Sequence, residues 1–332
     1  MITTAADIPA AQRELELLPE FRWFEVDANP LGWDSLVGDS PQNLFNTSPL
    51  LRAHAMGNAR PIGIVVPCHG VSVAIGGVMC WSGREQRLST LAFPALATTG
   101  APDLVSALTA WLFAQGVAEI EIGSFISGVE GYRLPTANAV LRQRLEFVWD
   151  LSGSPEQRHR ALRSNHKRKL QKLLKQSMEL REITRHQAEQ MTRLRIQWSR
   201  RRAMPLGLLQ VVQMYQYHRF LHRHLTMPGI GHLYGLYDKA GVLLSLAYML
   251  ETDSLAFYMI GASAPAGYLM NASLRLFWEL AERYQSRGLK FLHFGGVPAD
   301  AASEAHEENG VFRFKAGFGI EPTSRASLLI KK

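Results

Sequence analysis

Cysteine is scarce in this sequence, and an apolar leader is missing. The two cysteines, Cys68 and Cys80, cannot form a disulfide framework, so we expect a protein of the reducing cytoplasm. The first thirty residues contain no apolar stretch of the kind that marks a signal peptide. Both observations argue against a secreted protein stabilised by disulfides.

Charge is missing from one long stretch, which has no Lys, Arg, Asp or Glu between Arg60 and Arg84. Its length would suffice to cross a bilayer. However, Pro67, His69 and Gly70 interrupt its middle, and both halves are rich in Val and Ile. This pattern predicts two buried strands joined by a turn rather than a transmembrane segment.

The chain as a whole is basic, with a formal net charge of +7 at pH 7. A basic balance suits anionic partners such as RNA, a nucleotide or a membrane surface, although many basic proteins have no such partner. Residues 158–175 hold eight Lys or Arg and no acid, whereas a solvated helix face normally mixes both signs. This concentration favours an anionic partner, and the predicted nucleic-acid or phosphate-binding residues are Arg163, Lys167, Arg168, Lys169 and Lys172.

These cations lie in a segment, residues 154–225, that is predicted to be helical. Ser154 suits an N-cap and Pro155 the first helical position of a long helix. The apolar stripe of that helix comprises Leu162, Leu170, Leu173 and Leu174.

The same order of elements occurs twice. A helical pattern ends at Gly116 and a strand begins at Val117, and the same happens at Gly288 and Leu289. Upstream of each helix, two strands joined by a Gly-containing turn precede a third strand, so each half reads β-turn-β-β-helix-β. Because four consecutive elements agree, we predict an internal duplication rather than coincidental spacing.

Several stretches occur in a recognisable order: LFNTSPLLRA, LRSNHKRKLQKLLKQ, and then AFYMIGAS through to GVFRFKAGFG near the end. Together they resemble the FemAB-type aminoacyltransferases and their CelD-like acyltransferase relatives, both GNAT-like N-acyltransferases. The resemblance implies two tandem GNAT-like domains and N-acyl transfer. FemAB members take an amino acid from aminoacyl-tRNA and attach it to an amine of a peptidoglycan precursor, and relatives use acyl-CoA or other activated donors.

The resemblance also implies roles for two residues. Lys315, in the FK-x-GF part of the last stretch, would lie at the active site and bind or polarise substrate. Tyr258 matches an aromatic position near the acceptor, with a half-buried strand tyrosine as the alternative. The acetyl-CoA loop of ordinary GNAT enzymes, Gln/Arg-x-x-Gly-x-Gly/Ala, is replaced here by GASAPAGYLMNA. This departure, and the lack of an inserted coiled coil, argue against acetyl-CoA bound in the usual manner without excluding an acyl-CoA.

Amide formation from an ester or thioester needs donors for the developing oxyanion and a route for the amine proton. Lys315, with Arg313 as a companion, could neutralise a phosphate or a carbonyl oxygen, or it could simply cover the neighbouring phenylalanines with its stem. Glu251 and His293 are the predicted bases, and a satisfied strand residue is the alternative for each.

Gly261 and Gly267 lie in the turn between a strand and the last long helix. They would allow backbone N–H groups to approach an oxyanion, or they simply make the turn. Asn271 would cap the helix or bind substrate. His218 and His222 share a helix face near His224, but no cysteine or carboxylate completes a metal site there, so no metal is predicted.

We therefore predict an α/β (α+β) protein of two tandem GNAT-like domains, each a mixed, largely antiparallel sheet flanked by helices, related by duplication. The predicted domains are residues 1–152 and 153–332, the second opening with the basic helical segment 154–225. The predicted activity is aminoacyl-tRNA-dependent transfer to an amine of a cell-wall precursor or a natural-product peptide, with tRNA as partner and no tightly bound cofactor. The alternatives are an acyl-CoA-dependent N-acyltransferase of exopolysaccharide or secondary metabolism, and a non-catalytic RNA-binding protein. Peripheral contact with a membrane is also compatible with the basic segment.

Overall fold

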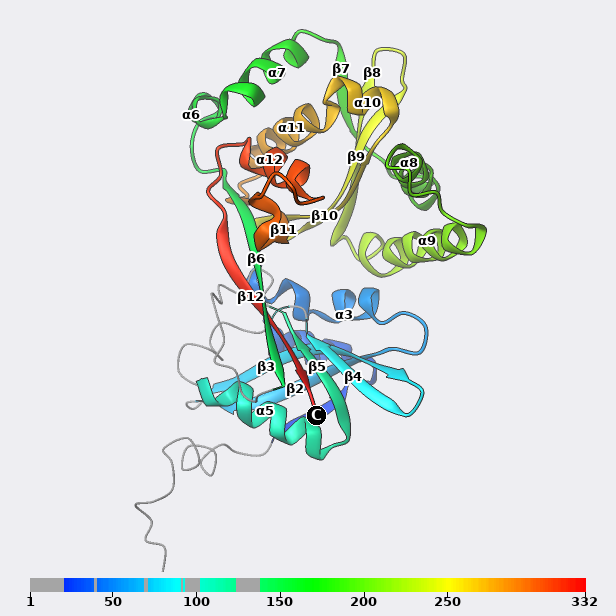
Figure 1. The fold of residues 1–332 in the computed structure, drawn as a ribbon, viewed down its shortest axis with the longest axis vertical. Coiled ribbons are helices and arrows are strands. Elements are labelled where there is room, and N and C mark those ends of the chain that lie inside the picture. Colours follow the sequence, from blue (N-terminus) through cyan, green and yellow to red (C-terminus); the bar gives the residue numbers. More distant parts are fainter. Residues whose placement is uncertain (1–20, 39–40, 69–70, 91, 93–101, 124–137) are drawn as a thin grey trace, which may run out of the picture. The chain divides into compact units, whose positions relative to one another are not determined.

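The computed structural model describes residues 21–38, 41–68, 71–90, 92, 102–123 and 138–332. The chain divides into two compact units, drawn as a ribbon in Figure 1. Unit 1 comprises Met1–Arg144 and Ser324–Lys332, and unit 2 comprises Leu145–Thr323. Among the described residues, no helix is both long enough and apolar enough to cross a membrane.

Unit 1 contains the neighbouring strands β1-β2-β3-β4-β5-β12. These strands are β1 (Arg22–Glu25), β2 (Arg60–Cys68), β3 (Val71–Ser82), β4 (Glu85–Thr90), β5 (Val117–Ile122) and β12 (Thr323–Lys331). Its helices and helical turns are η1 (Val26–Ala28), α2 (Pro30–Val37), η2 (Pro41–Asn46), α3 (Ser48–His54) and α5 (Pro102–Ala114). The stretch without charge forms the antiparallel hairpin β2–β3, which confirms the prediction of two strands rather than a transmembrane helix.

Unit 2 contains the neighbouring strands β11-β10-β9-β8-β7. These are β7 (Met178–Glu182), β8 (Gly231–Asp238), β9 (Leu243–Glu251), β10 (Leu255–Ser263) and β11 (Phe291–Pro298). Its longer helices are α7 (Ser164–Leu174), α8 (Gln187–Arg201), α9 (Leu208–Leu221), α11 (Ala272–Ser286) and α12 (Asn309–Ala316). Shorter ones are α6 (Pro155–Ala161), the π-helical turn η3 (His222–Thr226), α10 (Pro265–Met270) and η4 (Ala299–Ala302). In Figure 1, α11 and α12 lie on one side of these strands, and α8 and α9 on the other.

The predicted repeat is present in the strand topology. In unit 1, β1 to β4 pair successively as antiparallel neighbours, and α5 then leads to β5, which is parallel to β4. In unit 2, β7 to β10 are likewise antiparallel, and α10 and α11 lead to β11, which is parallel to β10. Two tandem units of one mixed, largely antiparallel topology confirm the predicted fold class.

The predicted division of the chain differs from these units at both ends of the second domain. β6 (Ala139–Asp150) begins in unit 1, and its second half belongs to unit 2, where β6 neighbours β11. β12, the last strand, instead pairs antiparallel with β5 in unit 1. Local sequence pattern marks a strand but does not name its partner, so this exchange was not visible in the sequence.

The first part of the basic segment, residues 154–176, contains two helices where one continuous helix was predicted. Leu162 and Arg163 adopt extended backbone angles, so α6 ends before them and α7 begins after them. Within α7, Leu170 and Leu173 are buried, whereas Leu174 is exposed. The segment also contains the strand β7, which the density of charged residues obscured in the sequence.

Helix ends follow local chemistry closely. Ser154 caps α6 and accepts a hydrogen bond from the backbone N–H of Gln157, as its residue type predicted. Gly116 and Gly288 follow the last turns of α5 and α11 with φ of 91° and 87°. Positive φ is the conformation that favours glycine after a helix, and it ends both helices where the repeat was first recognised.

Aromatic side chains fill the core of unit 2. The ring of Phe318 lies 4.9 Å from the rings of both Trp149 and Phe294, and Phe277 lies at the same distance from Phe294. These separations are typical of favourable aromatic pairs. The GVFRFKAGFG stretch, which forms α12 and the turn after it, therefore contributes directly to this core.

The glycines of that stretch allow it to approach the junction of α6 and α7. A Cβ atom on Gly319 would lie 2.1 Å from the carbonyl oxygen of Ala161, and one on Gly317 would lie 2.2 Å from the ring of His166. Arg163 donates its backbone N–H to the carbonyl of Gly317 at 3.0 Å. Larger residues would displace the basic helices, so packing accounts for these two glycines.

Candidate active site

The parallel strands β10 and β11 of unit 2 stay paired over only part of their length, at Leu255–Phe291, Ala256–Leu292 and Phe257–His293. Directly after these pairs, β10 has a bulge between Tyr258 and Ile260, which leaves Met259 without a partner on β9. A bulge bends its strand and frees backbone groups from the ladder. Residues Tyr258 to Gly261 border a pocket of about 410 Å³ at this place.

Lys315 lies close to the point where the two strands separate. Its side chain is only 5% exposed, and its Nζ donates to the carbonyl oxygen of Gly296 at 3.0 Å and lies 5.9 Å from the centre of the Phe147 ring. A Cβ atom on Gly295 would lie 3.9 Å from this Nζ and 3.7 Å from the carbonyl oxygen of Tyr258. Lys315 is therefore an internal cation, not a surface lysine that covers the phenylalanines. Exclusion of water strengthens the field of such a charge.

His293 is buried on β11, two residues before Gly295, and both of its ring nitrogens make hydrogen bonds. The backbone N–H of Gly295 donates to Nδ1 at 2.9 Å, so the ring proton belongs on Nε2, which lies 3.1 Å from a carboxylate oxygen of Glu146. A ring with this tautomer has no lone pair left to accept a proton from substrate. The predicted role of His293 as a base is therefore replaced by an orienting role toward Glu146.

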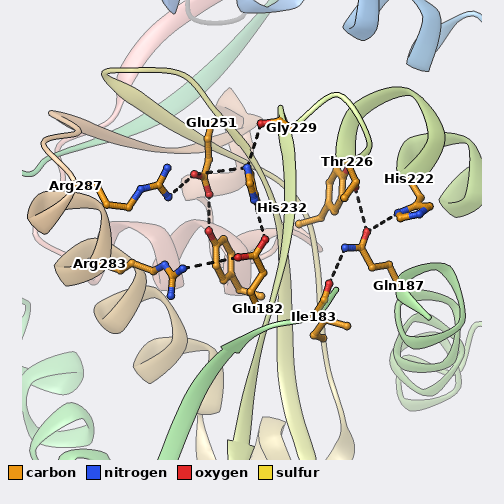
Figure 2. A network of polar contacts seen from close by, with 12 residues as sticks. Glu182, Ile183, Gln187, His222, Thr226, Gly229, His232, Glu251, Arg283 and Arg287 are labelled. Atoms are coloured by element: carbon orange, nitrogen blue, oxygen red, sulfur yellow. Dashed lines mark hydrogen bonds and ion pairs between the residues drawn. The ribbon is translucent and has the colours of Figure 1, made fainter. Parts of the chain in front are cut away.

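Glu251, the other predicted base, lies in a separate polar network (Figure 2). One of its oxygens accepts hydrogen bonds from Tyr234 at 2.8 Å and Tyr284 at 2.9 Å, and the other binds Arg287 at 2.6 Å. Burial, followed by the adjacent carboxylate, raises the pKa of Tyr234 and holds it in the donor form. Glu251 thus joins β8, β9 and α11, and its contacts correspond to the structural alternative rather than to a catalytic base.

Tyr258, which the resemblance places near the acceptor, lines the pocket. A Cβ atom on Gly261 would lie 2.1 Å from the Tyr258 hydroxyl, so glycine at this position makes room for the tyrosine ring. Burial raises the pKa of Tyr258 to about 12, while the charge of Arg195 opposes the shift. The phenol is therefore neutral and able to donate a hydrogen bond into the pocket at neutral pH.

Gly267 and Asn271 have structural roles that the sequence did not separate from substrate binding. A Cβ atom on Gly267 would lie 1.9 Å from the carbonyl oxygen of Leu244, so this glycine lets α10 pack against β9. Asn271 has φ 59° between α10 and α11, and its side chain makes no capping bond to α11. Its Oδ1 instead accepts a hydrogen bond from Lys169 at 2.9 Å.

The predicted anion-binding residues fall into two groups. Arg163, Arg168 and Lys172 are exposed on α7 and at its start. Lys167 and Lys169 are half-buried and bind the carbonyl of Arg160 and the side chain of Asn271. Arg313 is exposed on α12, unlike its neighbour Lys315. A basic surface therefore remains on α6 and α7, but some of its cations also join helices together.

The histidines near the end of α9 bind polar side chains of the protein. His218 Nδ1 lies 2.8 Å from the Thr192 hydroxyl, and His222 Nδ1 lies 3.0 Å from Gln187 Oε1, the second of which is visible in Figure 2. Within the described parts of the chain, no group of three His, Cys, Asp or Glu side chains could hold a metal ion.

Sequence reasoning missed several residues that the fold brings to this region. Glu146 comes from β6, far from β11 in sequence, and the pocket is lined by Arg195 and Trp198 of α8 and by Tyr217 of α9. The only local signal was the concentration of aromatic residues in those two helices. Whether these residues line one pocket depends on how α8 and α9 pack against β10.

Comparison with known proteins agrees with this geometry. Residues 160–315 match the family model of the acetyltransferase (GNAT) domain. The match covers 156 of the 332 residues. It contains α7 to β11 and ends at Lys315, so it includes the separated strands and the pocket. The match supports an acyltransferase of the GNAT kind, in agreement with the resemblance. No curated protein matches the chain in sequence.

Solved structures share the fold over nearly the whole chain. FemX aligns with a TM-score of 0.71 at 11% identity and covers 94% of this chain and 97% of its own. A tandem GNAT protein from the clavulanic acid biosynthesis pathway has a TM-score of 0.56 at 14% identity, covering 94% and 98%. L-PGS from Bacillus licheniformis has a TM-score of 0.51 at 12% identity, covering 89% and 92%. At these identities the similarity establishes the tandem GNAT fold.

Proposed function

We propose that the protein is an N-acyltransferase that moves an aminoacyl group from aminoacyl-tRNA to an amine acceptor. The observation that carries this proposal is the buried ammonium of Lys315 beside the place where β10 and β11 separate. A fixed cation in a region without water stabilises negative charge that develops on an acyl oxygen or on the leaving group.

The bulge of β10 supplies a second group for the same chemistry. Met259 has no partner on β9 and borders the pocket, so we assign its backbone N–H as the donor to an acyl oxygen. A Cβ atom on Gly295 would lie 3.9 Å from Lys315 Nζ and 3.7 Å from the carbonyl oxygen of Tyr258, the residue before Met259, which suits an acyl group bound between β10 and β11. Attack by an amine on that acyl carbon would complete the transfer.

The choice of an aminoacyl donor rests on charge and on fold. The exposed cations of α6 and α7 suit the phosphates of a nucleic acid. The fold shared with FemX and the resemblance to FemAB-type enzymes point the same way. An acyl-CoA donor is the second candidate, because the similar tandem GNAT protein of the clavulanic acid pathway is described in a form without AcCoA.

Thermal stability against ligands would test the donor. The purified protein would be heated with bulk aminoacylated tRNA, with a panel of acyl-CoAs, or with a UDP-linked peptidoglycan precursor. A ligand that binds only the folded state raises Tm by mass action, and a polyanion does so less at high salt. We expect a salt-sensitive rise with tRNA, followed by transfer of labelled amino acid to an added amine.

A rise with one acyl-CoA and none with tRNA would move the assignment to the second donor. Absence of transfer with every donor, despite a folded protein, would overturn the proposed function. The Lys315→Met variant serves as the negative control for transfer in each case.

A further inference from the structure

The pocket beside the β10 bulge contains a buried histidine that the reaction described so far does not use. His218 lines the pocket, although its side chain is only 2% exposed. Its neighbours in the pocket wall are mainly apolar or aromatic: Trp198, Met214, Tyr217, Tyr258, Met259, Ile260 and Val311. A buried histidine in such surroundings is expected to be hydrogen-bonded or to have a functional role.

The hydrogen bonds of His218 define its tautomer. The Thr192 hydroxyl donates its proton to the carbonyl of Ala188 at 2.6 Å. That hydroxyl oxygen therefore accepts the bond it shares with His218 Nδ1 at 2.8 Å, so the ring proton lies on Nδ1. Nε2 then carries the lone pair.

The position of Nε2 makes this lone pair usable. Among the described residues, no protein group is hydrogen-bonded to Nε2, yet Nε2 is not one of the fully buried atoms without a partner. It therefore keeps some contact with solvent, and the pocket that the ring lines is where that contact occurs. Burial, and then the charge of Arg195, lower the pKa of His218 to about 4, which keeps the ring neutral at neutral pH.

Arg195 provides the second feature of the pocket. Its guanidinium carbon lies 4.8 Å from the centre of the Trp198 ring, and among the described residues no carboxylate lies within ion-pair distance of it. Its charge acts on Tyr217, His218 and Tyr258, which are the other titratable groups of the pocket wall. A cation without a counter-ion at the edge of an aromatic pocket suits a ligand that carries an anionic group.

We propose that this pocket binds the acceptor, a primary amine that also carries a carboxylate, with His218 as the base for the amine and Arg195 as the anchor for the carboxylate. The inference rests on the proposed function and specifies the acceptor side of that reaction. It gives His218 a catalytic role.

The lone pair of the neutral amine attacks the acyl carbon and forms the new C–N bond, and the proton of the resulting adduct passes to His218 Nε2. The bond to the donor's ribose oxygen, or to the sulfur of a thioester, then breaks, and its electron pair leaves with that atom. The leaving atom then takes that proton from His218, which restores the neutral imidazole. A weak base is sufficient, because the protonated nitrogen of the adduct is far more acidic than a free ammonium ion, and the apolar walls favour entry of the neutral amine.

Paired variants test the base. His218→Asn can keep a donor to Thr192 while removing the lone pair of Nε2, and Thr192→Val removes only the group that orients the ring. We expect His218→Asn to lower kcat by about 10²–10⁴-fold with little change in acceptor KM or in the Tm rise produced by aminoacylated tRNA. Thr192→Val should lower kcat less. Added imidazole should restore part of the activity of a His218→Gly variant.

The anchor is tested with two amines, L-lysine and cadaverine, which differ by a carboxylate. We expect wild type to prefer lysine, and Arg195→Gln to raise the KM for lysine about 10–100-fold while sparing cadaverine. Arg193→Gln is the matched control, because Arg193 is exposed on the same helix and bonded to Gln190.

The possible failures are distinguishable. Wild-type kcat in a folded His218→Asn variant, with no imidazole effect on His218→Gly, would overturn the base. An unchanged preference for lysine in Arg195→Gln would overturn the anchor. A wild-type protein that transfers to neither amine from any donor would instead overturn the proposed function itself.

Discussion

The two units share one topology but differ at the equivalent pair of parallel strands. In unit 1, β4 and β5 remain paired through Thr90–Ile122, and the next backbone N–H, that of Gly123, still donates to Thr90 at 2.7 Å. In unit 2, β10 and β11 separate after Phe257–His293, and β10 carries its bulge directly afterwards. The equivalent parallel strands thus stay paired in unit 1, which is closed at this place, and separate in unit 2, which is open.

Buried charge follows the same division. The acidic, basic and histidine residues that are almost completely buried in the described parts of the chain all belong to unit 2: Glu146, Arg158, His166, His218, Glu251, His293 and Lys315. His54 of unit 1 is half-buried as a residue, although its ring is shielded from water. The buried polar residues of unit 1 are Asn46, Ser48, Thr90 and Thr109, none of which is charged. Buried charges are costly unless they are paired or used, so the open unit is where the chemistry is expected.

Replacing Lys315 should have the largest effect and would sharpen the comparison most. Lys315→Met keeps the length and apolar stem but removes the internal ammonium, so we expect kcat to fall about 10²–10³-fold. Arg313→Met, an exposed cation on the same helix, is the matched control and should retain turnover. Equal activity of both variants would remove Lys315 from the mechanism, provided circular dichroism shows both folded.

Replacing Glu251 should separate buried charge that supports the fold from buried charge that supports turnover. Glu251→Gln weakens its bonds to Tyr284 and Arg287, and we expect a loss of about 1.5–3 kcal/mol in the free energy of unfolding. Because Arg287 is 43% exposed, solvent screens its share of this loss. Urea titration measures it, with the exposed Glu179→Gln as control, and kcat of the folded enzyme should change little. A collapse of kcat at full stability would restore Glu251 as a base.

Stability should decrease as pH falls from about 6.5 to about 4. Burial lowers the pKa of His166 and of His218 in unit 2, and of His54 in unit 1, from 6.5 to about 4. Between these values the unfolded chain binds more protons than the folded one, so each histidine removes up to about 1.4 kcal/mol per pH unit. Above pH 6.5 these groups have no further effect.

Urea titrations at pH 7, 6 and 5 would measure this dependence. His166→Gln should reduce the slope of unfolding free energy against pH by the share of one histidine. A variant with the wild-type slope would show that His166 is protonated in the folded state.

Removing single surface cations should have the smallest effect. We expect Arg168→Gln and Lys172→Gln each to weaken tRNA binding a few-fold and to reduce the slope of log K against log salt by about 0.7–0.9. Filter binding at several salt concentrations measures this, with Arg87→Gln in unit 1 as the control. If the unit 1 variant has the same effect, the basic surface of α7 is not the binding site.

The sequence predicted what depends on neighbours along the chain. Gly116 and Gly288 placed the helix ends, Ser154 placed a cap, and alternation placed the strands of the repeat. The resemblance directed attention to Lys315. Six of its nine neighbours in GVFRFKAGFG are phenylalanine or glycine, and this pattern is compatible both with a buried lysine and with a surface lysine that covers the phenylalanines. Whether His293 has a free lone pair depends on Gly295 and Glu146, and the latter arrives on a strand from the other half of the chain.

The exchange of β12 has a consequence for how the protein is made. Strands β1 to β5 of unit 1 precede unit 2 in the chain, yet β5, which pairs with β4, obtains its second neighbour only when residues 323–331 have been synthesised. Unit 2 is continuous in sequence and can complete its own pairings earlier. Long-range pairing of this kind slows folding and leaves an unpaired strand edge for a time. During translation, unit 1, which lacks buried charge, is therefore the unit that is completed last. A truncation before β12 would damage unit 1, although most of unit 1 lies far from β12 in sequence.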